Sequence, residues 1–458
     1  MNPAAVLDSL WQRAGLPGAA LAFANLTGNE PVFPSSFRVG TAAQASIAAA
    51  ALAACELGHQ RGVPRQRVSV AMEHASVECT GWFSVDGKVP QMWDKFSGLY
   101  RSADGWVRVH ANFAHHREGA LRLLGLDPAV ATRADAQAAM LDWNAVDFET
   151  AASGAGLVAT ALRSFDQWDA TGQAQVLAQQ PLFSIERIGD AAPLAMPRLS
   201  PEQQPLHGVR VIELTRILAG PVAGRALASH GADVMLVNSP HLPNIDAIAD
   251  TSRGKRSTHI DLRDPAGREA MDRLLADAHV FIQGYRPGGL QGLGYGPQEV
   301  ARQRPGVVHV SLSAYGNRGP WAARRGFDSL LQTSLGFNHA EGEGSGDGEP
   351  RPLPMQILDE ATGFLMAFAA CAALRRQQRE GGSWHVQLSL AQTAHWLRGL
   401  GRVEHGLHAA PPSRQPYLET SASGFGELIG VTPSAQLDRT PARYCRLSVP
   451  PGHSPPHW

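Results

Sequence analysis

The chain has 458 residues, of which 44% are hydrophobic, 18% charged and 7% aromatic. Its 40 Lys and Arg and 41 Asp and Glu leave a net charge of -1, which excludes a protein whose whole surface binds nucleic acid or anionic membrane by charge. The apolar fraction excludes a disordered chain. The length predicts about three domains at roughly 150 residues each.

Two further observations concern cellular location. The four cysteines lie far apart and form no C-x-x-C motif: Cys55, Cys79, Cys371 and Cys445. They predict neither a metal site nor a disulfide framework. Residues 1–15 lack the basic and apolar regions of a signal peptide. The longest apolar stretches, 47–54 and 364–374, are shorter than the ~20 residues of a membrane span. We therefore expect a cytoplasmic protein that has no membrane partner.

In the first half of the chain, residues 42–57 form an alanine-rich helical pattern, and residues 67–72 alternate as in a strand. Residues 100–111 carry an Asp-Gly turn between alternating apolar positions, which predicts a β-hairpin. Three helices are predicted after the hairpin: 117–125, 135–142 and 148–163.

The second half begins after a proline-rich polar linker at residues 191–206. Short β-branched runs then alternate with helical stretches. The strands are expected at 209–214, 233–238, 280–283 and 307–313, and the helices at 222–230 and 265–277. This alternation predicts an α/β fold with a doubly wound, mostly parallel, Rossmann-like sheet. The first half then supplies a smaller α+β domain.

The first strand–turn–helix contains Gly220-Pro221 and Gly224 instead of the G-x-G-x-x-G fingerprint, which disfavours a nicotinamide or flavin enzyme. The turn at 215–221 should still lie at the carboxyl edge of the sheet, where such folds bind ligands. A tight turn without a ligand is the alternative.

Basic residues recur in the loops that follow the strands: Arg253, Lys255, Arg256, Arg286, Arg324 and Arg325. Their shared location suits a polyanionic ligand such as a nucleotide diphosphate. Any single one of them could instead be solvated surface. The acidic, glycine-rich stretch 340–350 would repel phosphate and is interpreted as a mobile loop beside the site.

Asp359 precedes a long apolar helix. A helix cap is the plain interpretation, because Asp satisfies the free amides of a first turn. The alternative is a nucleophile: the helix field favours the ionised carboxylate, and a pKa near ~3.9 would require no general base. The histidine pairs 115–116 and 405/408 match no metal-ligand spacing, so we expect no metal.

Six motifs in the second half resemble the family III CoA-transferases, the group of formyl-CoA and carnitine CoA-transferases. They are GVRVIELTRILAGPVAGRALASHGADV (208–234), RGKRSTHIDL (253–262), AHVFIQGYRPGGLQGLGYG (278–296), RPGVVHVSLSAYGNRGP (304–320), RRGFDSLLQTSLG (324–336) and LDEATG (358–363).

The resemblance implies that Asp359 takes the acyl group of an acyl-CoA as a mixed anhydride and then becomes an aspartyl-CoA thioester. It places five residues in the CoA site: Ile217, Leu218, Ile260, Tyr285 and Arg325. It implies no metal and no permanently bound cofactor, because a CoA thioester is the substrate. The partners are then acyl-CoA and a carboxylic acid, and the assembly a homodimer, interlocked or not.

The first half resembles other parts of the same family in a different order. Residues 98–126 look like the small domain, which in family members follows the catalytic half. Residues 48–76 echo 366–394, and Thr41/Ala42 stand where the catalytic Asp would be. The expected domains are a degenerate partial unit (1–94), a small α+β domain (95–190), the linker (191–206) and a Rossmann-like catalytic domain (207–458).

Two other functions remain open. One is an acyl-CoA racemase or isomerase of the same superfamily, although Phe327 stands where racemases carry their His base. The other is a non-catalytic CoA-binding subunit, which the degenerate first half favours. The sequence leaves the acyl donor and the acceptor acid open.

Overall fold

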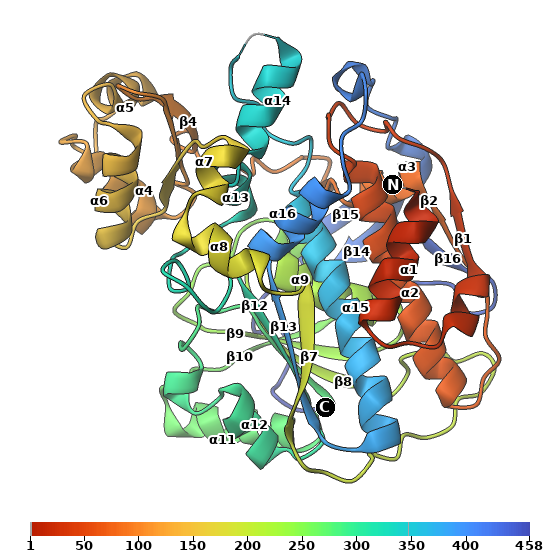
Figure 1. Cartoon of the computed structure of the whole chain (residues 1–458). Coiled ribbons are helices and arrows are strands. Elements are labelled where there is room, and N and C mark those ends of the chain that lie inside the picture. Colours follow the sequence, from red (N-terminus) through yellow and green to blue (C-terminus); the bar gives the residue numbers. More distant parts are fainter. Residues whose placement is uncertain (1, 347) are drawn as a thin grey trace.

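The computed structural model describes residues 2–346 and 348–458 (Figure 1). Its largest element is a seven-stranded sheet in the order β10-β9-β8-β11-β12-β13-β7. The strands are β7 (Phe183–Gly189), β8 (Arg210–Leu214), β9 (Asp233–Asn238), β10 (Arg256–His259), β11 (Val280–Gln283), β12 (Val308–Ser313) and β13 (Ser383–Ser389). Neighbouring strands are parallel except for β13 and β7. The predicted α/β fold with a mostly parallel sheet is confirmed.

Helices cover both faces of this sheet because its central strands are apolar on both sides. Val211 and Val280 face α9 (Ala219–Ser229) and α15 (Ile357–Glu380) in the main core. Ile212 and Phe281 face the opposite side, in a core with residues of α11 (Pro265–Ala276) and α12 (Pro297–Gln303).

A smaller α+β unit lies to one side of the sheet, with its own core around Tyr100, Val107 and Phe148 (Figure 1). Its antiparallel strands are β4 (Gly98–Arg101), β5 (Trp106–Val109) and β6 (Ala159–Ala161), and its helices are α4 (Ala114–Leu123), α5 (Arg133–Met140) and α6 (Ala145–Gly154). The predicted hairpin is therefore present. The helix predicted over 148–163 is too long, because residues 159–161 pair with β5 instead.

The two ends of the chain share two small sheets. One joins β1 (Ala24–Thr27), β2 (Val68–Ala71) and β16 (Ala435–Leu437). The other joins β3 (Phe83–Val85), β14 (Leu418–Ser423) and β15 (Gly426–Val431). The domain limits at 94, 190 and 206 stay a prediction, and β7, which belongs to the proposed 95–190 unit, pairs with β13.

The internal echo corresponds to two similar successions of elements. In one, α2 (Val39–Gln60) is followed by β2 and then directly by α3 (Met72–Glu78); in the other, α15 is followed by β13 and directly by α16 (Leu390–Gly399). Met72 and Leu390 align in the echo, and each is the first residue of its helix. The long helices α2 and α15 pack against each other in the main core.

By length and composition, α2 and α15 could cross a membrane, since they extend well beyond the apolar stretches noted in the sequence. Their most apolar stretches are completely buried inside the protein, as in core helices. The remaining helices are α1 (Pro3–Arg13), α7 (Phe165–Asp169), α8 (Gly172–Ala178), α10 (Ile248–Thr251), α13 (Asp328–Ser334) and α14 (Phe337–Ser345), besides four 3-10 turns in the described ranges.

The stretch predicted as a mobile loop, 340–350, is helical as far as Ser345, the last residue of α14. Glu341 is buried there and accepts hydrogen bonds from the Ser35 hydroxyl at 2.5 Å and the Ser36 hydroxyl at 2.9 Å. These bonds attach α14 to the N-terminal segment. Asp347 of the same stretch lies outside the described residues.

Candidate active site

Asp359 lines a cavity of about 330 Å³ at the carboxyl edge of the large sheet. This volume lies within the range of small-molecule sites. Its walls come from the loop after β8 (216–219), the loop after β11 (284–287) and the segment 324–327. The small α+β unit adds Phe113, His115 and His116. The cavity therefore lies where an open parallel sheet is expected to bind its ligand.

The loop after β8 is held in an uncommon conformation. Ile217 has φ of 77°, in the left-handed region that a β-branched residue enters only at a cost. A Cβ at Gly220 would lie 2.4 Å from that of Thr215, so only glycine fits there. The Thr215 hydroxyl donates to Glu213 at 2.6 Å, and Glu213 pairs with the fully buried Lys255 at 2.8 Å. Lys255 also donates to the Pro221 carbonyl, so these contacts hold the loop against the start of α9.

Asp359 lies in the first turn of α15, with 8% of its surface exposed. Its backbone N–H donates to the carboxylate of Asp328 at 2.9 Å. Burial raises the pKa of Asp359 well above its usual range, the nearby charges of Asp328 and Glu360 raise it further, and the backbone amide of Ala219 acts in the opposite direction. The ordinary pKa expected from the sequence is therefore wrong, because the helix field does not compensate for desolvation and two neighbouring acids.

Asp328, at the start of α13, is a site residue to which the sequence analysis gave no role. It is completely buried and accepts a hydrogen bond from the Gln332 side chain at 2.5 Å. Burial raises its pKa to about 7, although the amide of Asp359 and Gln332 both favour its ionised form. The Gly-Phe-Asp of the fifth motif was the available signal.

Glu360, the next residue along α15, contacts different partners. Its carboxylate lies 3.6 Å from Arg225, which also pairs with Asp250. Burial raises the pKa of Glu360 to about 8, while Arg225 lowers it. Three acids thus lie close together around the first turn of α15, and the cavity lining includes Asp359 alone.

Cations dominate the cavity wall. Arg325 donates to Nε2 of His116 at 2.7 Å, and burial lowers the pKa of that histidine to about 3, so it is neutral. Arg216 stacks on Phe113 at 5.3 Å. Within 2–346 and 348–458, neither Arg216, Arg286 nor Arg325 forms an ion pair with a carboxylate. The cavity therefore favours an anionic ligand.

The structure brings together most of the residues expected at the site. Ile217, Leu218, Tyr285 and Arg325 line the cavity with Asp359. Ile260 does not line it: this residue follows β10 and packs in the core beside α11.

Three of the cations expected to bind an anion are engaged inside the protein instead. Arg253 pairs with Asp250 at 2.6 Å, Lys255 with Glu213, and Arg256 with Asp233 at 3.1 Å. Their proposed role in ligand binding is corrected, because none of the three lines the cavity.

The echo of this site at the start of α2 lacks the acid. Thr41 occupies the position that aligns with Asp359, and its backbone N–H donates to the Glu30 carboxylate at 2.7 Å. In the same way, the backbone N–H of Asp359 donates to the carboxylate of Asp328. The supporting carboxylate is thus present in both places, but only α15 carries a carboxyl at the aligned position.

The fold and the cavity define an α/β protein that holds a buried carboxyl group beside an arginine-rich pocket. The model of CoA-transferase family III matches residues 206–423. An acyl-CoA transferase of Gibberella moniliformis is 30% identical over 416 residues, covering 81% of this chain and 73% of that protein. The chain belongs to CoA-transferase family III.

Other relatives match shorter parts. The succinate–glutarate CoA-transferase of Agrobacterium fabrum is 32% identical over 238 residues, covering 48% of this chain and 58% of that protein. A solved structure of a hypothetical protein from Mycobacterium tuberculosis is 32% identical and has a TM-score of 0.40. The match covers 43% of this chain and 58% of the chain in that structure. The chain thus spans little more than half of that structure.

Proposed function

We propose that the protein transfers CoA from an acyl-CoA to a carboxylic acid through a covalent intermediate on Asp359. The observation that carries this proposal is the position of Asp359: it lines the arginine-rich cavity together with the loop after β8. The names of the relatives, which include acyl-CoA transferases and succinate–glutarate CoA-transferases, support the same reaction class.

The proposed reaction proceeds by two matched exchanges. The Asp359 carboxylate attacks the thioester carbonyl, which gives a mixed anhydride and releases the CoA thiolate. The thiolate attacks the Asp359 carbonyl, which releases the donor acid and leaves an aspartyl-CoA thioester. The acceptor carboxylate then attacks this thioester and again releases the thiolate. Attack of the thiolate on the acceptor's acyl carbonyl yields the new acyl-CoA and free Asp359.

The cavity supplies what these steps require. Burial leaves the carboxylate of Asp359 poorly solvated, and the backbone amide of Ala219 stabilises its charged form. Arg216, Arg286 and Arg325 favour the phosphates and the thiolate of CoA. One thioester replaces another, so the mechanism needs neither ATP nor a metal.

The test is peptide mapping after incubation with acetyl-CoA or succinyl-CoA, followed by trapping with hydroxylamine. We expect a modification on Asp359 and none on Glu360, its neighbour in the same peptide, because Glu360 contacts Arg225 away from the cavity. An adduct on another residue, or none with any donor while CoA still binds, would contradict the covalent mechanism and favour a CoA-binding subunit.

The variant Asp359→Ala completes this test. We expect turnover to fall by at least about a thousandfold, as when other covalent nucleophiles are removed. Affinity for CoA, measured by calorimetry, should stay within a few-fold because the arginines remain. The racemase alternative has no support in this cavity, since Phe327 stands at the position of its base and stacks on His110 at 4.0 Å.

A further inference from the structure

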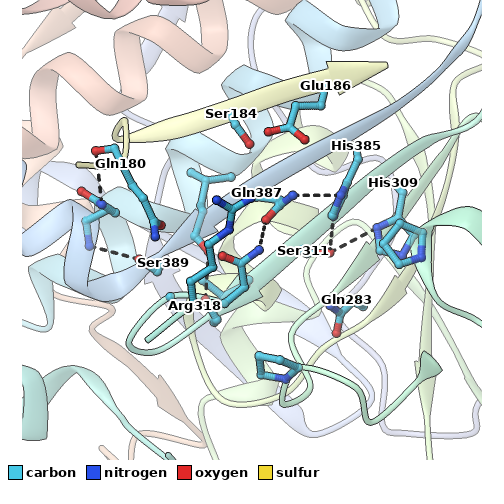
Figure 2. Close-up of a pocket in the computed structure, with 18 of the residues that line it drawn as sticks. Gln180, Ser184, Glu186, Gln283, His309, Ser311, Arg318, His385, Gln387 and Ser389 are labelled. Atoms are coloured by element: carbon cyan, nitrogen blue, oxygen red, sulfur yellow. Dashed lines mark hydrogen bonds between the residues drawn. The ribbon is translucent and has the colours of Figure 1, made fainter. Parts of the chain in front are cut away.

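A second cavity of about 350 Å³ lies over β12, β13 and β7 (Figure 2). It shares four wall residues with the cavity of Asp359: Arg286, Pro287, Leu312 and Ser313. The two cavities are therefore neighbours across the carboxyl ends of β11 and β12. None of the five residues predicted for the CoA site lines the second cavity.

The floor of this cavity is polar because the strands alternate. Val310 and Val386 face the core, and the residues beside them in sequence face the cavity. The strand register aligns His309 with His385 and Glu186, and Ser311 with Gln387 and Ser184. Two polar rows thus cross β12, β13 and β7. They lie on the same face of the sheet as Ile212 and Phe281, which pack beneath α11 on the other strands.

A hydrogen-bonded chain links the floor (Figure 2). The Gln387 amide donates to Nδ1 of His385 at 3.1 Å, and Nε2 of His385 lies 2.9 Å from the Ser311 hydroxyl. That hydroxyl lies 3.2 Å from Nδ1 of His309. The Gln387 carbonyl accepts from Asn317. These bonds orient the side chains before any ligand enters.

The floor is uncharged on β12 and β13, whereas the rim, which includes Glu186 at the end of its row on β7, is charged. Burial lowers the pKa of His309 to about 3 and that of His385 to about 4, so both are neutral near pH 7. The rim carries exposed Arg286 and Arg318 against a single acid, Glu186. A ligand with a carboxylate at the rim and further oxygen atoms on the floor would satisfy both. A purely apolar chain would leave the polar floor unpaired, at a cost in affinity.

We propose that this cavity binds a short hydroxy- or dicarboxylic acid, and that this acid is the acceptor that enters the neighbouring cavity of Asp359. The acceptor role rests on the proposed transferase function, whereas the binding of such an acid does not. The cavity thus selects hydrophilic acids over fatty acids of the same length.

The experiment compares succinate, L-malate and butyrate by calorimetry on the full chain without CoA. The test variant is Ser311→Ala with Gln387→Leu, which removes all four hydrogen bonds of the chain. The matched control is Ser69→Ala with Gln436→Leu, the same changes on β2 and β16, outside both cavities. Circular dichroism and thermal melting verify that both variants are folded.

We expect the wild type to bind succinate or malate at least about tenfold more tightly than butyrate, through two or more additional hydrogen bonds. The test variant should lose about tenfold in affinity for these two acids and none for butyrate, and the control should match the wild type. Butyrate binding as tightly as the others, or an equal loss for all three acids, would overturn the proposal.

A kinetic measurement distinguishes the free acceptor acid from the acyl group of the donor thioester as the occupant of the cavity. If the cavity held the acyl group of the donor, the test variant would form the Asp359 adduct from succinyl-CoA more slowly than the control, which would overturn the acceptor role. A wild type that forms no adduct would contradict the transferase function, while calorimetry would still decide whether the cavity binds the acid.

Discussion

Asp359 must be ionised to act as a nucleophile, yet its surroundings favour the protonated form. Burial, Asp328 and Glu360 all raise its pKa, and the Ala219 amide alone among the resolved influences lowers it. A desolvated carboxylate is a stronger nucleophile than a hydrated one, so the same burial that reduces the ionised fraction raises its reactivity. The balance between these effects sets the acid limb of the pH profile.

Replacing Asp328 by Asn tests this balance. The amide oxygen of Asn can still accept from the Asp359 N–H, but the like charge is gone, so the pKa of Asp359 falls. We expect the acid limb of adduct formation to move to lower pH, with a rate at pH 8 within a few-fold of the wild type. The rate of adduct formation, measured on quenched samples between pH 5 and 8, gives the position of the acid limb. An acid limb that stays in place or moves to higher pH would contradict the effect of Asp328 on the pKa of Asp359. The control is Asp277→Asn on the exposed surface, which should leave the limb in place.

At the scale of elements, the site depends on the contact between α15 and α9. A Cβ at Gly363 would lie 2.6 Å from the Ala219 carbonyl oxygen and 2.6 Å from Val222. The first residues of α9 therefore approach α15 closely enough for the Ala219 amide to influence Asp359.

The variant Gly363→Ala should separate these helices. We expect a loss of about 1–3 kcal/mol in the free energy of unfolding, as for other overpacked cores. We also expect slower adduct formation, because the Ala219 amide moves away from Asp359. Urea unfolding measures the first and hydroxylamine trapping the second. Gly399→Ala on α16, where an added Cβ meets nothing within 4 Å, should change neither.

The sequence predicted the elements whose patterns are local. Strands β8, β9, β11 and β12 follow from short β-branched runs, and α2 and α15 from long apolar ones. The helix over 148–163 was predicted too long because pairing between β6 and β5 is a long-range effect, which helical periodicity does not contain.

Most of the residues predicted from the motifs line the cavity, but the motifs did not predict its electrostatics. Asp328 and Asp359 are 31 residues apart, so their coupling depends on how α13 meets α15. Lys255 lies in a loop predicted as solvated surface, but its partner Glu213 lies on β8, 42 residues earlier in the sequence. Ile260 matches the family motif in sequence, and its position in the core follows from packing against α11.

At the scale of the whole molecule, buried acids make stability depend on pH. The folded-state pKa is about 7 for Asp328 and about 8 for Glu360, against ordinary values of 3.8 and 4.5. A carboxyl with a raised folded pKa binds its proton more tightly in the folded state, so its contribution is complete below the ordinary pKa and is lost as pH rises through the folded one. Unfolded histidines are mostly neutral above pH ~7.

We therefore expect the free energy of unfolding to fall between pH 7 and 9. The variant Glu360→Gln, which replaces the protonated carboxyl by a neutral amide, should reduce this decline. Urea unfolding at pH 7, 8 and 9 measures it. A wild type that gains stability over this range would contradict the raised pKa values, and an exposed control, Glu427→Gln, should leave the slope unchanged.

Two similar contacts lie at the starts of the helices that echo each other in sequence: Glu30 accepts from the Thr41 N–H, and Asp328 accepts from the Asp359 N–H. At α15, the buried acids Asp328 and Glu360 both raise the pKa of Asp359, so the ionised form of Asp359 is disfavoured there. At α2, a threonine stands at the aligned position. The two long helices that echo each other in sequence thus differ at their first turns: α2 packs in the core without such acids, and α15 carries them.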